Sequence, residues 1–144
     1  MIDVESANRS GMLVDEDAAV ELARRVLAAE GVVDGELGLS FVPPDEMRAL
    51  KSDHLGIDEV TDVLSFPIDG RAALPEGMPR ALGDVVLCPQ VVGEAWRGPL
   101  VHGLLHLLGY DHERDDGRMA RLERRLRLKG GLREGLIERG RPSA

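Results

Sequence analysis

Three of the four histidines in this chain lie in residues 102–112, which read His-Gly-Leu-Leu-His-Leu-Leu-Gly-Tyr-Asp-His. His102 and His106 are four residues apart, so on an α-helix they share one face and both imidazoles can reach the same point. Gly109 can take the left-handed conformation that ends a helix, which would let His112 turn back toward the other two. Three imidazoles with room for a fourth ligand are the arrangement that a catalytic zinc uses. We therefore predict one zinc ion per chain, bound by His102, His106 and His112.

The chemistry expected of such a site is hydrolysis. A metal held by three neutral imidazoles keeps its double positive charge, can lower the pKa of bound water to about 7, and can polarise a carbonyl or phosphoryl oxygen. The three histidines and Gly109 also fit the extended zinc-protease motif. Gly103, however, stands where that motif has the glutamate that acts as the base in peptide hydrolysis. The missing glutamate therefore argues against a metalloprotease, which stays an alternative to hydrolysis of another substrate.

The strands and helices expected around these histidines together predict an α+β fold. The length favours a single domain, residues 1–144, with a small mixed sheet of about four strands covered by helices and the metal-binding helix near the C-terminal third. Alternating apolar and polar residues predict strands at 2–7, 37–41, 61–67 and 83–88. Capping and breaking residues predict helices at 16–30, from 44 over a short stretch, at 89–96, at 100–108 and at 116–128. Residues 51–60 and 69–82 are expected to be loops, and about 130–144 a short helix or a frayed tail.

Composition limits where the protein works. The single cysteine, Cys88, excludes an internal disulfide and fits a reducing cytoplasm. No stretch approaches the roughly 20 apolar residues of a membrane span, and the acidic N-terminus has no apolar signal core. We therefore expect a cytoplasmic protein with no membrane partner.

Charge is unevenly distributed along the chain. The net charge is −8, but residues 1–112 carry 8 Lys and Arg against 20 Asp and Glu, whereas residues 113–144 carry 10 against 6. Overall acidity argues against tight nonspecific binding of nucleic acid. The predicted helix at 116–128 is the basic exception, and its arginines are either a solvated face or a contact for RNA. Those on one face are Arg118, Arg121, Arg124 and Arg125.

Two further segments, combined with the histidines, resemble a known family. Residues 61–67 read Thr-Asp-Val-Leu-Ser-Phe-Pro and residues 83–89 read Gly-Asp-Val-Val-Leu-Cys-Pro. In this order and spacing, from about residue 40 to 115, the chain resembles the YbeY family. The resemblance implies an α+β sheet crossed by the metal helix, with His102, His106 and His112 as zinc ligands. It also implies a metal-dependent endoribonuclease that cleaves single-stranded RNA in ribosomal RNA maturation, at the 3′ end of the small-subunit RNA, and in ribosome quality control, with the small ribosomal subunit and its proteins as partners.

The chain departs from that family at one catalytic position. Many members have an arginine shortly before the 61–67 segment, where this chain has none. Arg48 and Lys51 are the nearest cations, and we predict that one of them stabilises the phosphate, although arginine and lysine are not equivalent in bidentate contacts. Asp111 either orients an imidazole, acts as a base, or caps the turn after Gly109. The nucleophile, water or the 2′-hydroxyl of the RNA, stays open.

A non-enzymatic interpretation is a ribosome-assembly factor with a structural metal. Structural zinc normally has four protein ligands, so a site of three histidines with an open position disfavours this interpretation.

Overall fold

The computed structural model describes residues 1–110. Along these residues the elements are β1 (Ile2–Asn8), α1 (Glu16–Ala29), β2 (Gly35–Phe41), α2 (Pro44–Leu55), β3 (Val63–Pro67), β4 (Ala81–Leu87), α3 (Pro89–Val92) and α4 (Arg97–Leu107). The helix predicted at 116–128 and the tail predicted from about 130 lie outside the described residues.

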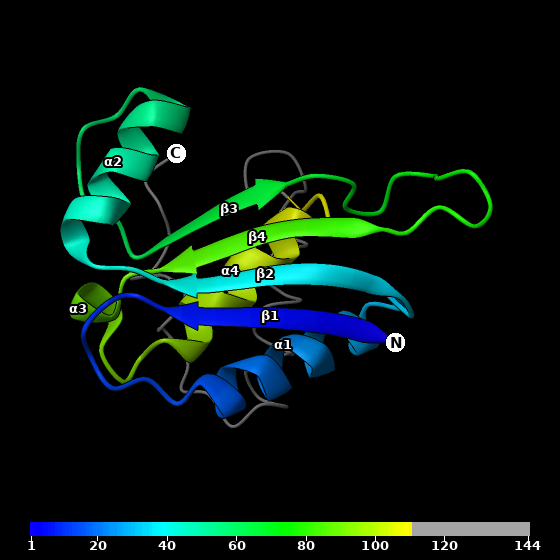
Figure 1. The fold of residues 1–144 in the computed structure, drawn as a ribbon, viewed down its shortest axis with the longest axis horizontal. Coiled ribbons are helices and arrows are strands. Elements are labelled where there is room, and N and C mark those ends of the chain that lie inside the picture. Colours follow the sequence, from blue (N-terminus) through cyan, green and yellow to red (C-terminus); the bar gives the residue numbers. More distant parts are fainter. Residues whose placement is uncertain (111–144) are drawn as a thin grey trace.

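The four strands form one mixed sheet in the order β1-β2-β4-β3. β1, β2 and β4 are parallel neighbours, and β3 runs antiparallel beside β4. Parallel neighbours need a crossover connection, which α1 provides between β1 and β2 (Figure 1). The prediction of an α+β fold with a small mixed sheet of about four strands is confirmed.

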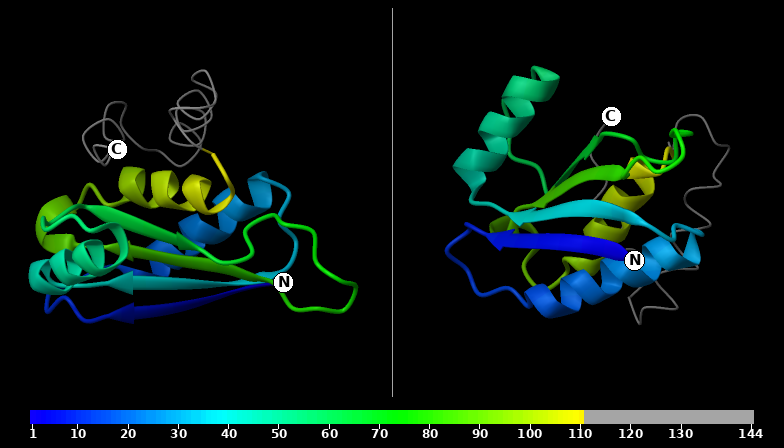
Figure 2. Two further views of the ribbon diagram at one scale, coloured as in Figure 1. Left: turned by 90° about the horizontal axis from the view of Figure 1, so that it is seen from above. Right: turned by 45° about the vertical axis from the view of Figure 1, so that its right-hand side comes forward.

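Two helices cover one face of this sheet. α1 and α4 lie together behind the strands, as two further views confirm (Figures 1 and 2). The main core lies between these helices and the sheet, where Leu37, Leu39 and Phe41 of β2 alternate inward and meet Leu100 and Leu104 of α4. Because the helix that carries the histidines contributes to this core, the sheet holds it in place.

A second, smaller cluster lies on the opposite face. Met47 of α2 packs there with Leu64 of β3 and Val86 of β4. Since neighbouring residues of a strand point to opposite faces, β3 and β4 support both clusters. Within residues 1–110, no helix is long and apolar enough to cross a membrane.

α2 is longer than the sequence predicted. Residues 51–60 were expected to form a loop, but α2 continues to Leu55 and ends at Gly56, whose φ of 70° lies in the left-handed region. Lys51 lies one turn after Met47, and both are buried on the inner side of the helix. Lysine is charged and therefore suggested an exposed loop, but a long side chain of this kind can bury its methylene groups within a helix that packs on the sheet.

The helices on either side of Trp96 also differ from the prediction. α3 was expected to reach about Trp96 but ends at Val92, because Gly93 follows with a φ of 55°. α4 begins at Arg97, before the Gly98-Pro99 pair that was expected to separate the two helices. Proline is tolerated in a first helical turn, where the amide has no partner within the helix, so Pro99 does not interrupt α4.

Candidate metal centre

His102 and His106 lie together on α4, as their spacing predicts. Their Nε2 atoms are 2.9 Å apart, and the centroids of the two rings are 4.4 Å apart at an angle of 69° between the ring planes. The His102 residue is 1% exposed, whereas His106 is half-buried. The imidazole of His102 is therefore enclosed by protein, whereas that of His106 is partly open to solvent.

This pair suits a shared metal ion. Two nitrogens bound to one tetrahedral zinc at about 2.0–2.1 Å lie roughly 3.3 Å apart, close to the separation seen here. Among residues 1–110, no three His, Cys, Asp or Glu side chains are gathered for a metal. The third predicted ligand, His112, lies outside the described residues, so its part in the site stays a prediction.

The end of α4 has the geometry that the sequence predicted for Gly109. Its φ is 96°, and its N–H donates to the His106 carbonyl oxygen at 3.0 Å. The Tyr110 N–H donates to the Leu105 carbonyl oxygen at 3.1 Å. These two bonds and the left-handed glycine between them form a Schellman motif, which reverses the chain at the end of a helix. The backbone therefore turns directly after the histidine pair.

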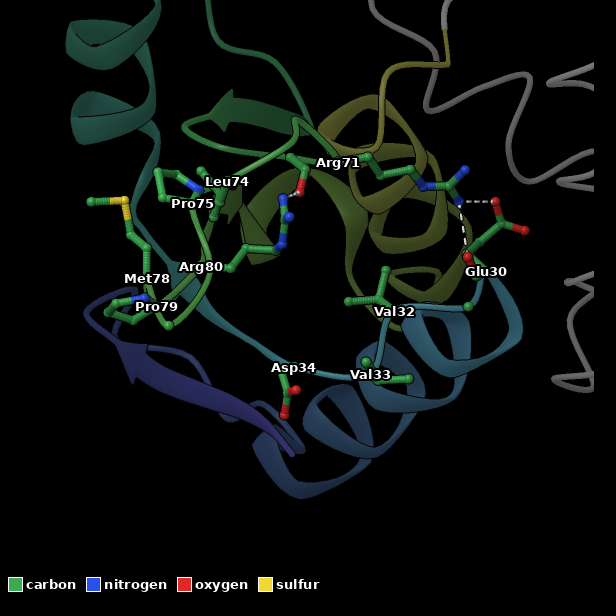
Figure 3. Close-up of a pocket in the computed structure, with 13 residues that line it drawn as sticks. Glu30, Val32, Val33, Asp34, Arg71, Leu74, Pro75, Met78, Pro79 and Arg80 are labelled. Carbon is green, nitrogen blue, oxygen red and sulfur yellow. Dashed lines mark hydrogen bonds and ion pairs between the residues drawn. The ribbon is translucent and has the colours of Figure 1, made fainter.

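Side chains from two distant segments hold Tyr110. Its hydroxyl donates to Glu30 Oε1 at 2.8 Å, and the Arg71 guanidinium lies 5.6 Å from the centroid of its ring. Arg71 donates to the same Glu30 oxygen at 2.5 Å, an ion pair visible in the close-up (Figure 3). Gly70 brings this loop against α4, since a Cβ on it would lie 2.7 Å from the Leu107 carbonyl oxygen.

A cavity of about 790 Å³ opens beside this cluster, between the residues after α1 and the loop that leads to β4 (Figure 3). Arg80 shapes that loop, because it donates to the carbonyl oxygens of Gly70 at 2.6 Å and Ala72 at 2.8 Å.

Gly103 lets α4 lie close to the sheet. A Cβ on this residue would be 3.0 Å from Val63 Cγ2, 3.0 Å from Val85 Cγ1 and 3.1 Å from Ser65 Oγ. The Ser65 hydroxyl also donates to the Gly103 carbonyl oxygen at 2.8 Å. Position 103 therefore faces β3 and β4, where the side chain of a protease glutamate would have no room.

Asp62 is a buried carboxylate near His102. Its Oδ1 accepts the Val63 N–H at 2.8 Å and the Thr61 hydroxyl at 3.3 Å, whereas Oδ2 has no hydrogen-bond partner among the described residues. Burial raises the pKa of this carboxyl, and the hydrogen bonds from Val63 and Thr61 and the charge of His102 partly oppose that shift. Asp62, just before β3, is therefore close enough to His102 on α4 for the two charges to interact.

The structure gives the two predicted catalytic cations other partners. Lys51 is 3% exposed, and its Nζ lies 2.6 Å from Glu59 Oε1. Arg48 is exposed on α2, with Nε 3.7 Å from Asp58 Oδ1. The catalytic roles of Arg48 and Lys51 stay predictions, as does that of Asp111, which lies outside the described residues.

The fourth histidine, His54, is exposed at the end of α2. Its ring centroid lies 4.7 Å from that of Phe66 on β3. Phe66 lines the cluster on the α2 side of the sheet, whereas the His102–His106 pair is carried by α4 on the opposite side. His54 is therefore separated from the pair by the sheet.

Comparison with known proteins agrees with the arrangement of these elements. Residues 5–129 match the family model described as Endoribonuclease YbeY. The chain belongs to the YbeY family. An Endoribonuclease YbeY from Alcanivorax borkumensis is 34% identical over 91% of this chain and 82% of its own length. Another from Salinispora tropica is 40% identical over 77% of this chain and 83% of its own length.

A solved structure has a similar fold. The solution structure of a protein from Thermotoga maritima is 25% identical, with a TM-score of 0.55 over 90% of this chain and 89% of that one. The family membership and this fold agree with what residues 61–67, 83–89 and 102–112 indicated.

The contacts that surround the end of the histidine helix could not be predicted from the sequence. Glu30 and Tyr110 are 80 residues apart in the sequence, and nothing in their spacing predicts that they meet. The close packing of Gly103 on β3, by contrast, has a signal in the sequence. A glycine within a leucine-rich helix indicates a point where the helix closely approaches its neighbour.

Proposed function

We propose that this protein is a zinc-dependent endoribonuclease that cleaves single-stranded RNA during ribosomal RNA maturation in the cytoplasm. The observation that carries the proposal is the 2.9 Å separation of the His102 and His106 Nε2 atoms on one face of α4. Membership of the YbeY family supports cleavage of RNA in particular. The proposal includes processing at the 3′ end of the small-subunit RNA, a part in ribosome quality control, and partners on the small ribosomal subunit.

His102, His106 and His112 would hold the ion. When bound, zinc supplies a positive charge that polarises a phosphoryl oxygen and makes water a better nucleophile. The sheet holds the buried His102, and the hydrogen bond from Ser65 to the Gly103 carbonyl oxygen fixes the turn of α4 next to it. The apolar core beneath α4 keeps bulk water away from the inner side of the pair.

The geometry of position 103 separates this proposal from a metalloprotease. Gly103 faces Val63 and Val85 at a distance that leaves no room for a glutamate, and therefore no base at the motif position. We infer that peptide hydrolysis is absent. A zinc-dependent cleavage of an unfolded protein that disappears in His102→Ala would show that this inference is wrong.

The test compares three purified proteins: wild type, His106→Ala and His54→Ala. We expect about one zinc per chain in wild type and in His54→Ala, whose imidazole lies across the sheet from the pair. Loss of a direct ligand should reduce zinc affinity in His106→Ala more than the 10- to 100-fold known for outer contacts. Defined RNAs should be cut by the first and third proteins, and a chelator should stop the cutting.

Two outcomes would overturn the proposal. Equal zinc content in wild type and His106→Ala would exclude the histidine site. Cutting that continues in the presence of the chelator and in His106→Ala would exclude a catalytic metal. Mapping the product ends on the same RNAs would also show whether the 2′-hydroxyl is the nucleophile, because that reaction leaves a cyclic phosphate.

A further inference from the structure

The cavity of about 790 Å³ beside the end of α4 is within the size range of ligand pockets in proteins. Its walls come from two segments, the residues that follow α1 and the loop that joins β3 to β4. Val32 and Val33 line one side, and Leu74, Met78 and Pro79 line the other (Figure 3). Apolar side chains on both sides suit a flat and largely apolar part of a ligand.

The charged groups that line the cavity leave one cation without an acidic partner. Glu30 forms an ion pair with Arg71, and Asp34 forms one with the N-terminal ammonium of Met1. Within residues 1–110, Arg80 forms no ion pair. The positive charge of Arg80 is therefore available to an anion that enters the cavity.

The loop itself holds the Arg80 guanidinium in place. Nη1 donates to the Gly70 carbonyl oxygen at 2.6 Å, and Nη2 donates to the Ala72 carbonyl oxygen at 2.8 Å. These bonds use two of the five N–H donors of an arginine, and the others have no acceptor among the described residues. A half-buried arginine that is already ordered suits a phosphate, to which the planar guanidinium can donate two parallel hydrogen bonds.

The same loop contacts α4 next to the histidine pair. Gly70, whose carbonyl oxygen accepts from Arg80, lies so close to α4 that a Cβ on it would be 2.7 Å from the Leu107 carbonyl oxygen. Leu107 directly follows His106. The cavity is therefore a neighbour of the candidate metal centre, within reach of a strand that is bound there.

We propose that this cavity is a subsite for one nucleotide of the RNA, with Arg80 on the phosphate and the apolar walls against the base. The inference rests on the proposed function, because it takes single-stranded RNA as the ligand. The bases of a single strand are unpaired, and apolar side chains can hold the face of such a base. The subsite gives a protein with a net charge of −8 a local contact for phosphate.

The first experiment compares Arg80→Gln with Arg9→Gln. Both variants lose one positive charge, but Arg9 follows β1 at the other end of the sheet, where it pairs with Glu46. Fluorescence polarisation with a chelator present, so that no RNA is cut, measures affinity for single-stranded RNA at several salt concentrations. We expect Arg80→Gln to bind about tenfold more weakly and to lower the salt slope by about 0.7, the value for one phosphate contact. Arg9→Gln should leave the slope unchanged.

A second pair of variants leaves Arg80 and its hydrogen bonds in place. Met78 is 56% exposed on the cavity wall, whereas Met12 is 42% exposed in the segment between β1 and α1, outside this cavity. Met78→Asp should weaken RNA binding about fivefold, because it brings a negative charge close to the phosphate. Met12→Asp adds the same charge elsewhere and should change the affinity less than about twofold.

Kinetics and a competitor make the assignment more specific. In Arg80→Gln and Met78→Asp the KM for RNA cutting should rise while kcat stays unchanged, because a contact away from the reacting bond contributes equally to the substrate and the transition state. Adenosine monophosphate should compete with RNA only weakly. Competition as strong as that by unlabelled RNA would assign the cavity to a free nucleotide and overturn the RNA subsite.

The outcomes distinguish this inference from the proposed function. If Arg80→Gln and Met78→Asp bind RNA as tightly as wild type, the cavity is no subsite, and the proposed function stands. If Arg80→Gln weakens binding without lowering the salt slope, or if the two controls weaken it equally, the effect is one of loop structure or overall charge and the inference fails. If wild type cuts no RNA, the proposed function fails, whereas the binding measurements still decide whether the cavity holds RNA.

Discussion

Replacing Gly103 by alanine tests how closely the histidine helix packs on the sheet. The added Cβ would lie 3.0 Å from Val63 Cγ2, 3.0 Å from Val85 Cγ1 and 3.1 Å from Ser65 Oγ. Carbon atoms pack best at about 3.5–4.0 Å, so α4 or the strands would have to move by about half an ångström. Val63 and Val85 belong to a packed core, which resists that movement.

Two opposing effects set the magnitude. Alanine is favoured over glycine within a helix by about 1 kcal/mol. Inserting a methyl group into a well-packed core costs about 1–3 kcal/mol. We therefore expect Gly103→Ala to lower the free energy of unfolding by about 1 kcal/mol. For a chain of nearly 150 residues, this corresponds to a Tm lower by about 2–4 °C.

A double-mutant cycle shows whether the contact with Val63 is the cause. Val63→Ala alone should cost about 2 kcal/mol, because it reduces apolar burial and leaves a cavity. It also removes the nearest atom on β3, so the effect of Gly103→Ala should shrink by about 1 kcal/mol in its presence. Urea unfolding followed by circular dichroism would measure all four proteins. The reasoning is refuted if Gly103→Ala is more stable than wild type, or if the two changes add to within about 0.3–0.5 kcal/mol.

Two further predictions concern a buried thiol and the basic C-terminal region. Burial raises the pKa of the Cys88 thiol, so above about pH 8.5 the unfolded chain ionises before the folded one and stability falls as pH rises. Unfolding of wild type and Cys88→Ala between about pH 8 and 10 should therefore show a steeper loss of stability in wild type, and equal slopes would contradict this. Neutralising Arg121, Arg124 and Arg125 should weaken binding of single-stranded RNA and reduce the salt slope by about 0.7 for each phosphate that these arginines neutralise in wild type. Fluorescence polarisation at several salt concentrations would measure it, and an unaltered slope with unaltered zinc content would mean that these arginines are a solvated face.

The sequence by itself determined the parts of this protein that depend on local pattern. The i, i+4 spacing of His102 and His106 predicted that their imidazoles meet, and Gly109 predicted the end of the helix, because both follow from the geometry of a few consecutive residues. The alternation of residues in four strands was sufficient to predict an α+β fold. The segments 61–67 and 83–89, together with the histidines, were sufficient to predict the family.

The tertiary structure decided which groups surround those residues. Lys51 was expected in a polar loop because it is charged. The structure instead buries it on the inner side of α2, where it pairs with Glu59. Glu30, Arg71 and Tyr110 meet only because α1 and the loop before β4 both reach the end of α4. These contacts join residues 41 and 80 positions apart, and no periodicity of the chain encodes them. They depend on how the sheet is ordered and packed, which is why the sequence predicted the histidine pair and only the fold revealed what surrounds it.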